Sequence, residues 1–166
     1  DRIDGALMIT ERDEHVYHEV LAHTPLAYLP QASRVLVIGG GDGGLVTQLL
    51  HHSHLKEIVW CEIDAAVLRM ARTHFPTLAA AQHDPRVTVL VKDAAKYVAE
   101  LAASISASSS TNRSGDGDGD GGDGGDDLDG LFFDAILIDS TDSRAATPLL
   151  ELPFCLLYTS PSPRDT

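Results

Sequence analysis

The sequence predicts an α/β fold built on a doubly wound, mostly parallel sheet. Four apolar runs typical of buried strands alternate with stretches of helical periodicity. A glycine-rich turn joins the first of these runs to the helix expected after it. An acidic residue closely follows each run, where the carboxyl ends of parallel strands form the usual ligand crevice. Such alternation implies right-handed crossovers between neighbouring parallel strands.

The chain opens on residues 4–10, which we expect to form a short strand or the end of a hairpin. A helix is predicted from Asp13, and Pro25 is expected to end it because proline lacks the N–H of a helix interior. Its apolar positions recur at roughly helical spacing and are Val16, Val20, Leu21 and Leu26.

The rest of the chain supplies the strands and helices of the predicted sheet. The strands are expected at residues 34–38, 57–62, 87–91 and 133–138. The helices are expected at about residues 43–52, 64–74 and 93–105, and Pro76 follows the second of them.

Two segments depart from this alternation. Residues 104–130 contain mostly Ser, Gly and Asp, so we expect a disordered acidic insert that cannot bury a core. Residues 156–166 continue neither strand nor helix, and we interpret them as a non-native tail, which leaves the fold incomplete at its C-terminus.

Composition excludes several classes of protein. The net charge of −13 argues against a nucleic-acid partner, which requires basic clusters. No apolar run reaches the roughly 18 residues expected of a membrane span. Two cysteines and no signal pattern indicate a cytoplasmic protein without a disulfide framework.

The acids after the four runs carry the main functional information. They are Asp42, Glu62, Asp93 and Asp139. In a parallel sheet these residues gather at one edge, where together they favour a cationic ligand and repel phosphate.

The turn after the first run contains the pattern G-x-G-x-x-G, formed by Gly39, Gly41 and Gly44, and Glu62 follows about twenty residues later. This pattern is typical of dinucleotide binding, and a nicotinamide-dependent oxidoreductase is one interpretation. Asp42 opposes it, because a carboxylate inside a phosphate cradle repels the pyrophosphate. A sulfonium nucleoside without phosphates avoids this conflict. A tight turn with no ligand is the third interpretation.

Together these motifs resemble those of the polyamine aminopropyltransferases, the family of the spermidine synthases. The matching stretches are DGALMITERDEHVYHEV (4–20), VLVIGGGDGG (35–44), CEID (61–64), VKDA (91–94) and ILIDSTD (136–142). The resemblance implies a methyltransferase-like Rossmann domain at residues 13–155, preceded by a remnant of a β-hairpin domain at residues 1–12. It also implies transfer of an aminopropyl group from decarboxylated S-adenosylmethionine to putrescine or a related polyamine, releasing methylthioadenosine.

The resemblance assigns roles to individual residues. Asp139 would accept the proton of the attacking amine. Glu62 would hold the ribose, Asp93 and Ala94 the adenine, and Asp42 the ammonium of the aminopropyl arm, beside the glycine turn with Gly39 and Gly41. The polyamine channel would be lined by Tyr17, His18, Asp42, Asp139, Ser140 and Asp142.

The resemblance further implies no cofactor besides the nucleoside co-substrate, no metal, and a homodimer or larger assembly. One departure concerns the loop after Asp142, where the family has Pro-x-Gly-Pro and this chain has residues 143–146, Ser-Arg-Ala-Ala. This departure supports a non-catalytic nucleoside-binding relative, and a methyltransferase on the same scaffold is a further alternative.

Several candidate sites also have purely structural interpretations. His51, His52 and His54 could bind a metal, but no cysteine or acid completes a set of ligands. The acidic repeat from Asp116 to Asp127 has the spacing of a calcium loop, which low complexity produces readily. Other residues could be ordinary surface or first-turn helix residues, namely Tyr17, His18, Glu11, Asp13 and Glu14.

Overall fold

The computed structural model describes residues 2–3, 6–7, 9–10, 12–111 and 132–140. Its elements in chain order are β1 (Arg2–Ile3), β2 (Ala6–Leu7), α1 (Glu14–Tyr28), β3 (Arg34–Gly39), α2 (Gly44–Leu49), β4 (Glu57–Glu62), α3 (Ala65–His74), α4 (Pro76–Ala79), the 3-10 helix η1 (Ala80–His83), β5 (Val87–Val91), α5 (Ala94–Thr111) and β6 (Ala135–Asp139). The chain divides into two compact units. The described residues up to Ala94 and those from Phe133 to Ser140 belong to the first, which carries the sheets; α5 from Ala95 belongs to the second.

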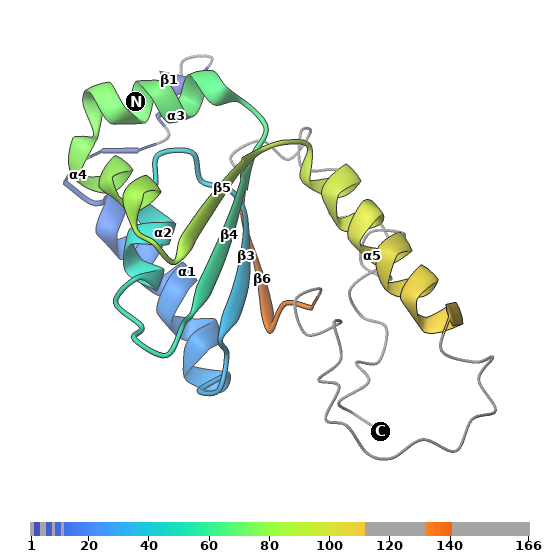
Figure 1. The fold of residues 1–166 in the computed structure, drawn as a ribbon. Coiled ribbons are helices and arrows are strands. Elements are labelled where there is room, and N and C mark those ends of the chain that lie inside the picture. Colours follow the sequence, from blue (N-terminus) through green and yellow to red (C-terminus); the bar gives the residue numbers. More distant parts are fainter. Residues whose placement is uncertain (1, 4–5, 8, 11, 112–131, 141–166) are drawn as a thin grey trace. The chain divides into compact units, whose positions relative to one another are not determined.

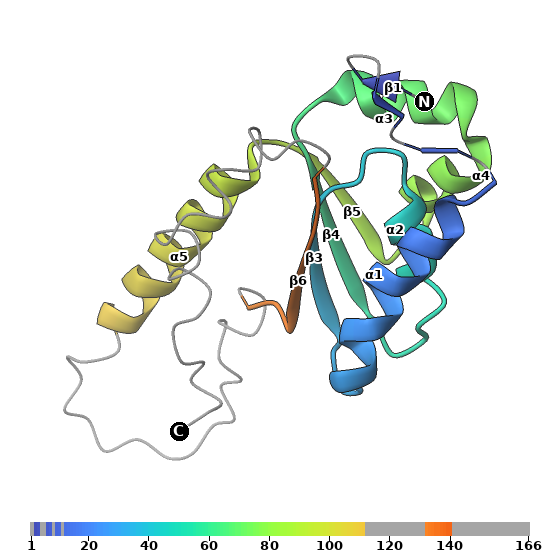
Figure 2. The same ribbon diagram turned by 180° about the vertical axis from the view of Figure 1, so that it is seen from behind.

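The main sheet has four strands in the order β5-β4-β3-β6, and all neighbours pair in parallel (Figure 1). The chain moves outward from β3 through β4 to β5 and then returns to the other side of β3 for β6, as Figure 2 shows from behind. This reversal creates a topological switch point between β3 and β6, where ligands bind in doubly wound sheets. The predicted fold class is confirmed.

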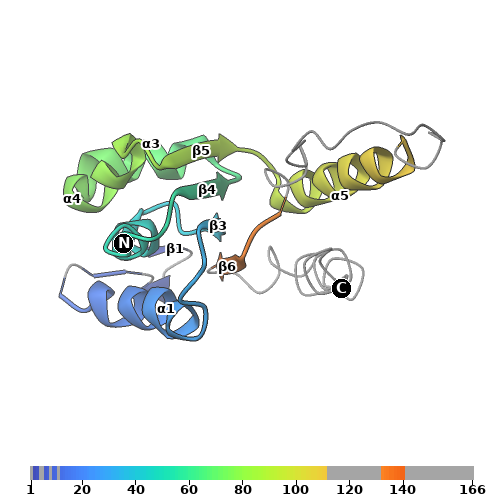
Figure 3. The same ribbon diagram turned by 60° about the horizontal axis from the view of Figure 1, so that its bottom comes forward.

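The core lies between the sheet and the helices of the first unit. Figure 3 shows α1 and α4 on the same face of the sheet. Apolar side chains from α1, α2 and the strands form one buried cluster, which includes Leu26, Leu45, Val37 and Trp60. Four consecutive residues of β3, 35–38, are buried, as expected for a central parallel strand.

The predicted N-terminal helix is longer than expected, and of its four predicted apolar positions Leu21 and Leu26 pack in or against the core whereas Val16 and Val20 do not. It continues through Pro25 to Tyr28, because Leu26 packs into the core and the proline ring already has a helical φ. Val16 and Val20 are 57% and 63% exposed. The buried positions are His18, Ala22 and Leu26, a stripe at spacing four that begins with a polar residue.

The predicted start of the disordered insert, residue 104, lies within helix α5 of the structure. α5 extends to Thr111, so residues 106–111, which we expected to be disordered, are helical, as are residues 104 and 105, where the predicted helix and the predicted insert overlap. Ser104 donates its hydroxyl to the carbonyl of Glu100, four residues back, and alanine and isoleucine at 102–107 tolerate a helix. The glycine–aspartate repeat itself and the tail at 156–166 lie outside the described residues.

At the N-terminus, β1 and β2 pair antiparallel as a small separate sheet, so the expected hairpin is present. Its assignment to a distinct domain stays a prediction. Across the described segments, the helices are too short or too polar to traverse a bilayer.

Candidate active site

The candidate site lies at the switch point, where the turn after β3 meets the end of β6. The amide of Gly40 donates to the carbonyl of Asp139 at 2.8 Å, which joins the two strand ends. Beneath the turn, Trp60 of β4 donates its indole N–H to the carbonyl of Gly39 at 2.8 Å. The turn is therefore fixed by both neighbouring strands, and Gly39, Gly40 and Gly43 adopt positive φ in it.

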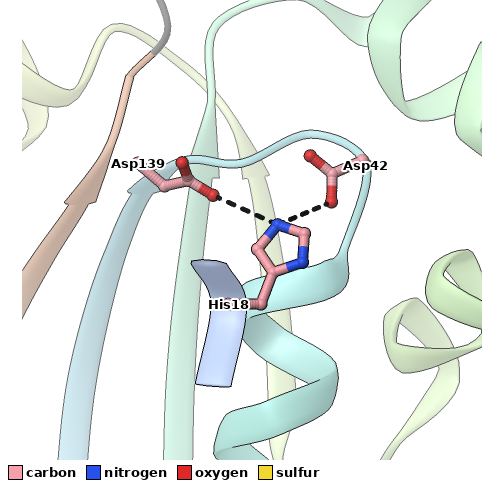
Figure 4. Close-up of side chains that lie close together, drawn as sticks. All are labelled: His18, Asp42 and Asp139. Atoms are coloured by element: carbon pink, nitrogen blue, oxygen red, sulfur yellow. Dashed lines mark ion pairs between the residues drawn. The ribbon is translucent and has the colours of Figure 1, made fainter. Parts of the chain in front are cut away.

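At the centre of the site, His18 of α1 lies between two carboxylates (Figure 4). Its Nε2 is 3.4 Å from Oδ1 of Asp42 and 4.0 Å from Oδ2 of Asp139. Only 2% of His18 and 5% of Asp139 are exposed. Residues from α1, the glycine turn and β6 thus converge, although 121 positions separate the first and last of them in the chain.

A further contact holds each of these three side chains. Glu14, one turn earlier on α1, lies 2.7 Å from Nδ1 of His18 through its Oε2. Tyr17 donates its hydroxyl to Oδ1 of Asp139 at 2.9 Å. The amide of Gly44 donates to Oδ1 of Asp42 at 2.7 Å, at the start of α2. The geometry of the site is therefore set by contacts within the fold.

Burial raises the pKa of Asp139 above its ordinary value. The hydrogen bond from Tyr17 and the imidazole of His18 lower this pKa, whereas the nearby charge of Asp42 raises it further. The pKa of the Tyr17 hydroxyl is also raised, first by burial and then by the charge of Asp139, so this hydroxyl stays a donor. Oδ2 of Asp139 has no hydrogen-bond partner among the described residues.

Glu62 lies at the end of β4, next to the glycine turn, and is 7% exposed. The backbone amide of Asp64 donates to its Oε1 at 2.9 Å. A Cβ added at Gly41 would come within 2.9 Å of its Oε2 and 2.5 Å of Cγ1 of Val67, so a side chain there would have to displace both neighbours. Burial raises the pKa of Glu62, and the backbone amides of Asp64 and Ile63 partly oppose this shift.

A side chain at Gly44 would also meet a neighbour, here on the side that faces α1. A Cβ at this position would fall 2.0 Å from Cε1 of His18, so the histidine ring packs directly on the glycine backbone. The third glycine of the predicted pattern therefore allows close approach of a side chain to the helix start.

The remaining predicted residues lie at other points of the same sheet edge or outside the described residues. Asp93 lies two residues after the end of β5 and is partly exposed, and Ala94, the first residue of α5, is 8% exposed. Ser140 directly follows β6 and is exposed. Asp142 and the altered loop at 143–146 lie outside the described residues.

The structure decides between some of the alternatives left open by the sequence. His18 is buried and Tyr17 is bonded to Asp139 although it is 53% exposed, so the interpretation of both as plain surface residues is wrong. Glu14 is a first-turn acid and also the partner of His18, a role that the sequence does not reveal.

The histidines after α2 contact one another and a residue that the sequence did not connect with them. Nδ1 of His23 on α1 lies 2.8 Å from Nε2 of His52, and His54 packs edge-on against His52. Burial lowers the pKa of His52, and neighbouring His23, His54 and His51 lower it further. The predicted calcium-loop pattern lies outside the described residues.

Comparison with known proteins identifies the family. The spermine/spermidine synthase domain matches residues 14–111, more than half of the chain. A polyamine aminopropyltransferase of Leptospira biflexa is 48% identical over 95 residues, which cover 57% of this chain and 34% of that protein. Spermidine synthase 1 of Hyoscyamus niger is 33% identical over 153 residues, covering 92% and 40% respectively.

Solved structures agree with this family assignment. A crystal structure of spermidine synthase in complex with the transition-state analogue AdoDATO matches with a TM-score of 0.72 and 30% identity, over 95% of this chain and 46% of that one. Human methyltransferase-like protein 13 in complex with SAH matches with a TM-score of 0.51 and 20% identity over 90% of this chain and 59% of that one, which supports the methyltransferase-like fold alone. The chain thus spans less than half the length of the curated relatives described above. It belongs to the spermine/spermidine synthase family.

Proposed function

We propose that the open reading frame encoding this chain specifies a polyamine aminopropyltransferase. It would move the aminopropyl group of decarboxylated S-adenosylmethionine to putrescine or a related polyamine and release methylthioadenosine. Both substrates are cationic, and the site presents carboxylates to them. The observation that carries the proposal is the pair Asp42 and Asp139 on either side of buried His18.

The strand order supports a binding direction for the nucleoside. Asp93, Glu62, Asp42 and Asp139 lie at or just past the carboxyl ends of β5, β4, β3 and β6, which are neighbours in this order. Adjacent strands are about 4.8 Å apart, so the four acids span about 14 Å along one sheet edge. An extended nucleoside fits this span, with adenine at Asp93, ribose at Glu62 and the aminopropyl arm at Asp42.

The reaction needs a neutral amine aligned behind the carbon bonded to sulfur. The amine nitrogen attacks this carbon, the carbon–sulfur bond breaks, and its electron pair converts the sulfonium to the neutral thioether of methylthioadenosine. The proton lost by the amine passes to a base, for which Oδ2 of Asp139 is our candidate. Orientation of the two reactants contributes most of the rate, about 7–11 kcal/mol in favourable cases.

The surroundings of Asp139 suit this role. A carboxylate whose pKa is raised by burial is a better base for an ammonium than an exposed one. Tyr17 occupies Oδ1 and leaves Oδ2 for the amine. His18 lies beside both acids. It could relay the proton, or it could hold in place the carboxylate that pairs with the second ammonium.

A transfer assay tests the proposal. The product of the open reading frame is incubated with decarboxylated S-adenosylmethionine and putrescine, and methylthioadenosine is measured by chromatography. We expect release from the wild type and a loss of at least about 100-fold in Asp139→Asn. Asp84→Asn is the matched control, because Asp84 precedes β5 at the opposite sheet edge and bonds to Arg86.

The outcomes separate the proposal from its alternatives. Release that Asp139→Asn abolishes and Asp84→Asn preserves supports the assignment. Nucleoside binding without release, with putrescine or any other polyamine, would favour a non-catalytic relative. Full turnover in Asp139→Asn would refute the role given to this carboxylate.

A further inference from the structure

Two imidazoles outside the candidate site join α1 to the turn after α2. Nδ1 of His23 on α1 lies 2.8 Å from Nε2 of His52, and the two ring centroids are 5.0 Å apart. Both side chains are half-buried, and they come from positions 29 residues apart. We propose that this imidazole pair, His23 and His52, is a proton-sensitive contact, which holds α1 to α2 near neutral pH and breaks when both rings are protonated.

The number of hydrogens that the imidazole pair can carry limits it to one extra proton. A neutral imidazole has one N–H donor and one acceptor nitrogen, so two neutral rings can share a hydrogen bond, as can one neutral and one protonated ring. When both rings are protonated, each of the facing nitrogens carries a hydrogen and no acceptor remains. The two positive charges, on rings with centroids 5.0 Å apart, then repel one another.

The surroundings of the imidazole pair oppose a second proton. The titratable and charged groups around the pair are Glu19, one turn before His23 on α1, His51 and His54 in the turn after α2, and Arg86 with its partner Asp84 before β5. His54 packs edge-on against His52, and the guanidinium of Arg86 donates to the carbonyl of His52 at 3.4 Å. Burial lowers the pKa of His52, and the charges of the three neighbouring histidines lower it further.

The direction of the pH effect follows from these contacts. The ordinary pKa of His52 is 6.5, and the folded chain lowers it. The stability that depends on neutral His52 is therefore fully present above pH 6.5 and is lost as pH falls through the folded pKa. Asp139 and Glu62 have raised pKa values and change stability in the opposite direction, but both carboxylates are present in every variant of the imidazole pair.

The imidazole pair is one of two contacts that flank the apolar packing between α1 and α2. Toward the glycine turn, the ring of His18 packs on the backbone of Gly44. Between that contact and the imidazole pair, Ala22 of α1 and Leu45 of α2 belong to the same buried cluster. Since α1 also carries Tyr17 and His18, protonation of the pair would loosen the helix that supplies two side chains of the candidate site.

Thermal unfolding of the 166-residue chain at pH 7 and at pH 5, followed by circular dichroism, tests the contact. His52→Gln and His23→Asn each leave one titrating ring beside a neutral amide, which can accept its hydrogen bond. We expect the fall in Tm between pH 7 and pH 5 to be at least about 3 °C larger in the wild type than in either variant. His83→Gln is the matched control, because it removes an exposed histidine of η1 and leaves the imidazole pair intact. Its fall in Tm should equal that of the wild type.

An NMR titration of the histidine Cε1 protons in the folded wild type is the second measurement, and it does not require any variant to fold. The two rings are assigned from the nuclear Overhauser effects between them. We expect the imidazole pair to take up its protons in two separate steps, the second of them below pH 6.5.

A smaller fall in Tm in both variants, together with two-step protonation in the wild type, would support the contact. Equal falls in the wild type and both variants, or protonation of both rings together near pH 6.5, would overturn it. A smaller fall in His52→Gln alone would also overturn it, because the burial of one ring would then be the cause. None of these outcomes requires turnover, so they are read separately from the transfer assay.

Discussion

Trp60 connects the core to the glycine turn, and Trp60→Phe should be costly for this reason. The side chain is 0% exposed, and its indole N–H donates to the carbonyl of Gly39. Its ring also lies under the turn, since Cη2 would be 3.3 Å from a Cβ at Gly43. Phenylalanine keeps an aromatic ring but removes the hydrogen bond and part of the volume.

The expected loss follows from these contacts. A partly buried carbonyl left without its donor costs about 1–3 kcal/mol. The void left by the smaller ring adds about 1 kcal/mol at roughly 24 cal/mol per Å³. We therefore expect Trp60→Phe to lower the free energy of unfolding by about 2–4 kcal/mol, a large part of the 5–15 kcal/mol typical of a domain.

Urea denaturation followed by circular dichroism measures this loss, because the variant lacks the chain's single tryptophan. Ile58→Val is the control. Ile58 is equally buried and lies on the same face of β4, and the substitution removes one methylene but no hydrogen bond. Its expected cost is about 0.5–1.5 kcal/mol. If Trp60→Phe costs no more than Ile58→Val, the hydrogen bond to Gly39 does not hold the turn.

Two further predictions concern residues around the turn. Burial raises the pKa of Glu62 above 4.5, so its contribution to stability is present below pH 4.5 and is lost as pH rises through the folded pKa. Glu62→Gln should therefore have a higher Tm than the wild type at pH 7 and a similar Tm near pH 4, while nucleoside affinity falls; a lower Tm at pH 7 would contradict the sign. Gly44→Ala should displace the ring of His18 and destabilise the fold by about 1–3 kcal/mol. Calorimetry should show at least tenfold weaker binding of decarboxylated S-adenosylmethionine to Gly44→Ala. Unchanged affinity would show that ligand binding does not require His18 in its present position.

The strands were predictable because each is a short run of apolar and β-branched residues, a signal that lies within the run itself. The bounds predicted for β4 and β5 match the structure, and those of β3 and β6 differ by one or two residues. The acids at the strand ends were predictable for the same reason, since parallel strands place their carboxyl ends at one edge.

Other features depend on contacts between distant residues and were not predictable. Val16 and Val20 have helical spacing, yet the core faces the stripe that starts at His18, a residue counted as polar. Pro25 normally ends a helix, but here Leu26 gains enough burial to continue it. The bond from Tyr17 to Asp139 joins residues 122 positions apart, so no local pattern contains it.

Recognition of the cationic arm by the carboxylate of Asp42 is the central claim, and a differential binding measurement tests it most directly. Decarboxylated S-adenosylmethionine carries the sulfonium and ammonium charges, whereas methylthioadenosine has the same nucleoside without them. We predict that Asp42→Asn in the product of the open reading frame weakens binding of the charged ligand about 10–150-fold, as expected for a lost charge-assisted hydrogen bond of about 1.5–3 kcal/mol. Affinity for methylthioadenosine should stay within about threefold. Equal weakening of both ligands, or no change in either, would contradict the claim.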